Sequence, residues 1–111
     1  MSNYQFTKEQ INKLVNLDPA LISKNYNNEN YYTYYYNEVA NNLSLNTIGH
    51  YHHFTMSMLR RIPGFILSTI KDEDGKELFL CGTKDGNICS TSEHLPEAVY
   101  NSYVKFLEDE L

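Results

Sequence analysis

Residues 65–91, FILSTIKDEDGKELFLCGTKDGNICST, consist of three short apolar runs separated by two turn sequences. The first turn, at residues 72–75, has an acidic start and ends in a glycine suited to a left-handed backbone. The second turn, at residues 83–86, repeats this chemistry. The stretch therefore predicts a three-stranded antiparallel β-meander at about residues 65–91.

The register of this meander follows if both turns are three-residue loops. Ile70 then lies opposite Leu78, and Cys81 lies opposite both Leu67 and Cys89. Alternation gives two apolar faces, one with Ile66, Ile70, Leu78, Leu80 and Ile88, the other with Phe65, Leu67, Phe79, Cys81 and Cys89. Because both faces are apolar, we expect each to be covered by this chain or by a partner.

Helical patterns flank the meander on both sides. Thr7 and Gln10 have the spacing of a capping box before an apolar stripe, and Asp18-Pro19 is a second helix start. Periodicity predicts further helices over residues 31–43 and 47–62, although tyrosine-rich residues 31–43 are also compatible with a strand.

Pro96 opens a last helix, at about residues 96–109, which carries one apolar stripe. We expect this helix to cover one face of the sheet and the N-terminal helices to cover the other. The sequence thus predicts one α+β domain over residues 1–111, with N-terminal helices, the meander and a C-terminal helix.

Composition and charge limit the functional classes. The chain has 9 Lys and Arg against 14 Asp and Glu, a net charge of −5, which is the wrong sign for a nucleic-acid binder. The polar start resembles no signal peptide, and no apolar run approaches the length that spans a bilayer, about 18–20 residues. We therefore expect a cytoplasmic protein with no membrane contact and two reduced cysteines.

No pattern in the sequence indicates catalysis. His50, His52 and His53 do not converge on one side of a helix or a strand, so a metal site is not expected. Cys81 and Cys89 have no neighbouring base, which favours buried thiols over a nucleophile. We expect no enzyme activity, no catalytic residue, no metal and no cofactor.

The acidic turn at residues 72–75 also has a partial likeness to a calcium-binding loop. Asp72 and Asp74 flank Gly75, but the glutamate that such a loop requires does not follow. A hairpin turn explains these residues better.

The acidic residues are concentrated in the second half of the chain. Residues 63–111 hold four Lys or Arg against ten Asp or Glu, whereas residues 1–62 hold five against four. The predicted topology gathers part of them at one end of the sheet, and two tyrosines lie outside the helical stripe of residues 31–43. The candidate partner-binding residues are Asp72, Glu73, Asp74, Glu93, Glu97, Tyr31 and Tyr34.

These features together favour a binding protein over an enzyme. We expect a small acidic protein that inhibits a basic partner protein, as an immunity protein neutralises a bacterial toxin such as a nuclease. One alternative is a phage-encoded inhibitor of a host defence enzyme. Another is a small homodimeric ligand-binding or structural domain that uses an uncovered sheet face.

Overall fold

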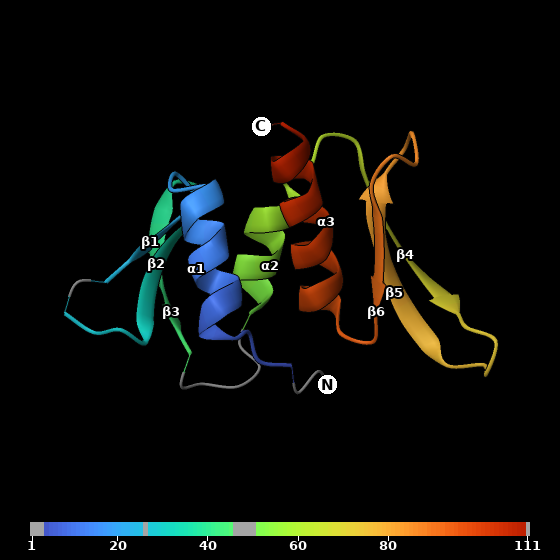
Figure 1. Cartoon of the computed structure of the whole chain (residues 1–111), viewed down its shortest axis with the longest axis horizontal. Helices are drawn as coiled ribbons and strands as arrows, with labels where there is room; N and C mark the ends of the chain where they lie inside the picture. Colours follow the sequence, from blue (N-terminus) through green and yellow to red (C-terminus); the bar gives the residue numbers. More distant parts are fainter. Residues whose placement is uncertain (1–3, 26, 46–50, 111) are drawn as a thin grey trace.

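Two three-stranded antiparallel sheets lie on either side of a layer of helices (Figure 1). The computed structural model describes residues 4–25, 27–45 and 51–110. In these ranges the elements are α1 (Lys8–Leu17), β1 (Ile22–Lys24), β2 (Tyr31–Tyr36), β3 (Val39–Ser44), α2 (His52–Leu59), β4 (Phe65–Lys71), β5 (Glu77–Thr83), β6 (Cys89–Ser92) and α3 (Leu95–Asp109). The mixed α+β class predicted from the sequence is confirmed.

Helix α1 begins at the predicted capping box. The Thr7 hydroxyl accepts the Gln10 N–H at 3.1 Å, and the Gln10 side chain accepts the Thr7 N–H at 2.9 Å. These two bonds satisfy backbone donors that the first turn of a helix leaves unpaired. The helix then buries Ile11 and Leu14 completely.

The segment after α1 is not a second helix, so the helix predicted at Asp18-Pro19 is wrong. Asp18 instead caps the C-terminal end of α1. Its N–H donates to the Leu14 carbonyl at 2.8 Å, which completes the helix. Its own carbonyl accepts the N–H of Leu21 and of Ile22, which closes a turn into β1. Pro19 therefore lies in a turn, another position where its fixed φ is tolerated.

The helix predicted over residues 31–43 is also wrong, because this segment forms the β2–β3 hairpin. Tyr32 and Tyr34 are buried while Tyr31 and Tyr35 are exposed, an alternation with the period of a strand. The two-residue turn has positive φ at both Asn37 and Glu38 (52° and 66°), as tight hairpins require. The β preference of tyrosine agrees with this strand pairing.

Helix α2 occupies the later part of the helix predicted over residues 47–62. Its described start is at His52, and residues 46–50 lie outside the described part of the chain. It packs against β2 and α3, between the two sheets.

The predicted meander is confirmed as β4, β5 and β6, with Ile70 opposite Leu78 and Leu67 opposite Cys81. The first turn has the expected left-handed glycine, with φ of +80° at Gly75. The predicted register of the third strand is wrong, because Cys81 lies opposite Ser90.

The second turn is one residue longer than predicted. Thr83 donates its N–H to the Ile88 carbonyl at 3.0 Å, which leaves residues 84–87 in the loop. The Asp85 carboxylate accepts the Asn87 N–H at 3.0 Å and so holds the additional residue. A shift of one residue moves each β6 side chain to the other face.

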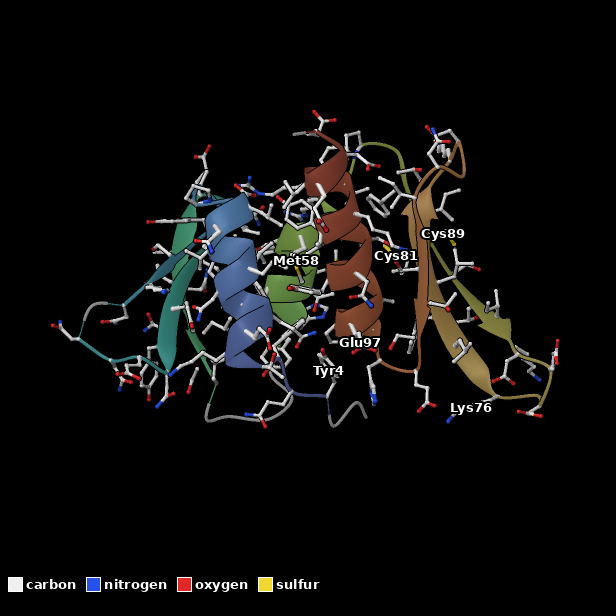
Figure 2. All side chains as sticks on the ribbon, viewed as in Figure 1. Tyr4, Met58, Lys76, Cys81, Cys89 and Glu97 are labelled. Carbon is white, nitrogen blue, oxygen red and sulfur yellow. The ribbon has the colours of Figure 1, made fainter. Side chains whose placement is uncertain are left out.

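This shift separates the two cysteines, which were expected to share a face. Cys81 points toward α3 and is buried, whereas Cys89 is exposed on the opposite face (Figure 2). Ile88 is correspondingly buried, contrary to its predicted placement with Ile66.

Only one face of the β4–β5–β6 sheet is covered by a helix in the described structure. Helix α3 packs against β5 and β6, but α1 and α2 lie on the far side of α3 (Figure 1). The expectation that the N-terminal helices cover the second face is therefore wrong. That face remains open and carries Ile66, Ile70, Leu78, Leu80 and Cys89.

Several tyrosine hydroxyls donate hydrogen bonds to neighbouring elements of the fold. Tyr100 donates to the Gln10 carbonyl at 2.7 Å, and Tyr32 donates to the Asn12 side chain at 2.7 Å. Burial raises the pKa of Tyr100 to about 12, and burial also raises the pKa of Tyr103, with the Asp18 carboxylate contributing. The folded state thus favours the protonated phenols.

We expect the protein to lose stability in alkali. The unfolded chain releases tyrosine protons near pH 10, about the ordinary pKa. A raised folded-state pKa contributes stability that is complete below this pH and is lost as the pH rises toward 12. Circular dichroism and tyrosinate absorbance, recorded together against pH, should show unfolding and the ionisation of the buried tyrosines in one transition. As a control, Y31F removes an exposed hydroxyl and should leave this transition unchanged. Ionisation of all the tyrosines near pH 10 with the fold intact would contradict the expectation.

Candidate interaction surface

Strand β4 is the most exposed element of the sheet. All seven of its residues are exposed, including Phe65, Ile66 and Leu67 at 40 % each and Ile70 at 37 %. Isolated exposed apolar residues are common on protein surfaces, whereas four on one short strand make β4 a candidate interaction element.

Among the described strands β5 is the only neighbour of β4, so within this part of the chain the backbone of β4 is unpaired along one side. Gly64 accepts the Lys84 N–H at 3.2 Å, and Asp72 donates its N–H to the Lys76 carbonyl at 2.9 Å. Hydrogen bonding alternates along an antiparallel strand, so even-numbered residues between these two face β5. The N–H and C=O groups that face away from β5 are those of Phe65, Leu67, Thr69 and Lys71.

The acidic turn, Asp72 to Asp74, lies at the tip of the β4–β5 hairpin. The Asp72 carboxylate accepts the N–H of Asp74 at 3.0 Å and of Lys76 at 2.8 Å, so this side chain holds the turn together. Glu73 and Asp74 are exposed. Of the three carboxylates, these two are therefore the ones available to a partner.

Two further candidate residues lie at the same end of the sheet. Glu93 pairs with Lys76, which connects the β6–α3 loop to the hairpin. Glu97, in the first turn of α3, accepts the Ser92 hydroxyl at 2.8 Å and is half-buried (Figure 2). Glu93 therefore lies close to the acidic turn, whereas the Glu97 carboxylate accepts a hydrogen bond within the fold.

The two candidate tyrosines are distant from the acidic turn. Tyr31 and Tyr34 belong to β2, in the other sheet, at the opposite end of the long axis (Figure 1). Tyr31 is exposed, but Tyr34 is buried against Phe54 with ring centroids 5.2 Å apart. The prediction that Tyr34 lies outside the core is therefore wrong.

The described histidines and cysteines do not form a metal-binding group. His53 stacks on Tyr36 at 4.9 Å, and Arg60 lies over the same ring at 4.8 Å. Burial raises the pKa of the Cys81 thiol, which disfavours a thiolate. Among the residues of described placement, no three His, Cys, Asp or Glu side chains are arranged to hold a metal ion, and His50 lies outside them.

Sequence reasoning missed the exposed edge of β4. The sequence FILSTIK, which is apolar on both faces, could have indicated an exposed strand. Its position at an edge, however, depends on which strands pair and where α3 packs.

No helix in the described ranges is long and apolar enough to cross a membrane. No protein-family model, curated protein or solved structure matches the chain.

Proposed function

We propose that this chain is a binding protein whose acidic turn captures and blocks a basic protein. The observation that supports the proposal is the exposed, hydrogen-bonded turn at the hairpin tip, which presents Glu73 and Asp74 at the end of the sheet where Glu93 pairs with Lys76. The simplest such role is immunity to a cognate toxin. A phage protein that blocks a host defence enzyme would use the same surface.

The geometry of the turn favours tight recognition. Asp72 fixes the turn through two backbone hydrogen bonds, so little conformational freedom remains to be lost when a partner binds. Loops ordered in advance bind more tightly than flexible ones for this reason.

The charge distribution favours rapid capture. The −5 net charge and the ten acidic residues of the second half create a field that attracts a basic surface. Electrostatic attraction of this kind raises association rates by orders of magnitude at low salt.

A charge-reversal variant tests the proposal. The double variant E73K and D74K keeps Asp72, which the turn needs, and replaces the two free carboxylates. The probe is the purified product of the neighbouring gene, because toxin and immunity genes are commonly adjacent. We expect the association rate, measured by surface plasmon resonance at low salt, to fall about 10- to 100-fold.

The matched control changes the same number of charges elsewhere. Asp109 and Glu110 are exposed at the C-terminal end of α3, and D109K with E110K alters the net charge equally. The control should retain most of the association rate. Equal losses in both double variants would show that the acidic turn has no specific role and would overturn the proposal.

A further inference from the structure

The outward side of β4 combines unpaired backbone groups with exposed apolar side chains. We propose that it pairs with β4 of a second copy of this chain, antiparallel and centred on Ser68, to form a six-stranded sheet. The inference is independent of the proposed function, because it rests on the strand rather than on the acidic turn.

The alternation of backbone groups defines the register. Only the outward-facing residues Phe65, Leu67, Thr69 and Lys71 can hydrogen-bond to a new strand. The register that uses all four places Phe65 opposite Lys71 of the second copy and Leu67 opposite its Thr69. Each of these pairs exchanges two hydrogen bonds, and Ser68 lies opposite itself on the two-fold axis.

The side chains are self-complementary in this register. Ile66 lies beside Ile70 of the second copy on the open face, and symmetry repeats this contact. On the other face, Phe65 lies beside the aliphatic stem of Lys71 of the second copy. β-branched and aromatic cross-strand pairs of this type stabilise antiparallel sheets.

The charges also favour the antiparallel arrangement. A parallel pair would place the two acidic turns side by side. In the antiparallel pair they lie at opposite ends, about 27 Å apart at about 3.4 Å per residue, far beyond the Debye length of about 8 Å. Each acidic turn instead lies beside the start of β4 in the second copy. At that point the Gly64 carbonyl accepts the Lys84 N–H.

The alternative occupant is a strand from another protein, but the self-complementary register favours a second copy, and the sequence of β4 indicates that its edge is paired. Edge strands that remain unpaired are usually protected by a charge, a proline or a bulge near the middle. The β4 sequence FILSTIK has its only charge at the last residue. A symmetric dimer covers the exposed edge of both copies at once and closes the assembly.

Disulfide trapping tests the register directly. Opposed residues that are not hydrogen-bonded have Cα atoms about 4.5 Å apart, within the range that a disulfide bridges, about 4.4–6.8 Å. In a C89S background, S68C should therefore cross-link to twice the 13.0 kDa chain mass under mild oxidation. T91C is the control, because Thr91 is exposed on the same face but lies on β6. We expect S68C to cross-link at least about tenfold faster than T91C, since only its thiols would be held within bonding distance.

Sedimentation of the unmodified chain provides the second measurement. The wild type should sediment as a dimer, and T69P should be monomeric because proline removes an outward N–H without touching the β4–β5 ladder. A wild type that remains a 13.0 kDa monomer at about 100 μM, with S68C cross-linking no faster than T91C, would overturn the proposal and leave the edge to another protein. Charge reversal at Glu73 and Asp74 tests the proposed function separately.

Discussion

The variant G82A is expected to destabilise the fold by about 3 kcal/mol. A Cβ atom at Gly82 would lie 2.3 Å from the Ile88 carbonyl oxygen and 3.1 Å from the Cys89 Cα. Both neighbours are backbone, so neither can rotate away. The same Ile88 carbonyl accepts the Thr83 N–H at 3.0 Å, and displacing it would break the hydrogen bond that closes the β5–β6 turn.

Chemical denaturation of G82A and G64A would distinguish the stability lost to a close Cβ contact from the stability lost to backbone strain. Gly64 has φ of +60° with nothing within 4 Å of its added Cβ, so G64A should cost only about 1 kcal/mol. If G82A lost no more stability than G64A, the close approach of β5 and β6 at Gly82 would be contradicted.

The variant D18A is expected to cost about 3 kcal/mol. The Asp18 carboxylate is almost fully buried, accepts the Tyr103 hydroxyl and pairs with Arg61 at 3.1 Å. It thereby joins the end of α1 to α3 and to the segment after α2. Alanine would leave the buried hydroxyl without an acceptor and the guanidinium without its anion.

Two further variants separate the contributions at this site. Y103F removes one hydroxyl and should cost about 1 kcal/mol, because Asp18 keeps Arg61. E29A breaks the exposed pair with Lys8 and should change stability by less than about 1 kcal/mol. Equal urea midpoints for D18A and E29A would show that the buried carboxylate contributes no more than a surface one.

The sequence predicts the parts of the fold that depend on local chemistry. Asp72 and Gly75 encode a turn of known length, so the β4–β5 register follows directly. Thr7 and Gln10 likewise specify the start of α1 through neighbouring atoms. In both cases the residues that determine the structure are within a few positions of one another.

The errors arose where two local patterns competed, and packing decided one case and a turn hydrogen bond the other. Residues 31–43 fit a helical stripe, but pairing of β2 with both β1 and β3 buries Tyr32 and Tyr34 more completely. At the second turn, the hydrogen bond from Asn87 to Asp85 lengthened the loop by one residue. One additional residue was enough to reverse the faces of β6.

The acidic part of the candidate site was predictable from the sequence, whereas its tyrosines and the exposed edge of β4 were not. The acidic turn and Glu93 were placed at one end from topology alone, and the Lys76 pair brings them together. Tyr34 was assigned to the surface because of the helical error. Strand β4 is exposed because α3 packs over β5 and β6. This packing joins distant segments, so no local sequence pattern predicts it.

The hydrogen bond from Tyr100 to the Gln10 carbonyl spans 90 positions and has a consequence for biosynthesis. Helix α3 lies between α1 and the β4–β5–β6 sheet, so the apolar surface that each of them directs toward α3 stays exposed until α3 leaves the ribosome. At about 5–20 residues per second, the N-terminal half waits on the order of ten seconds. During translation the nascent chain therefore exposes apolar surface that the finished fold buries.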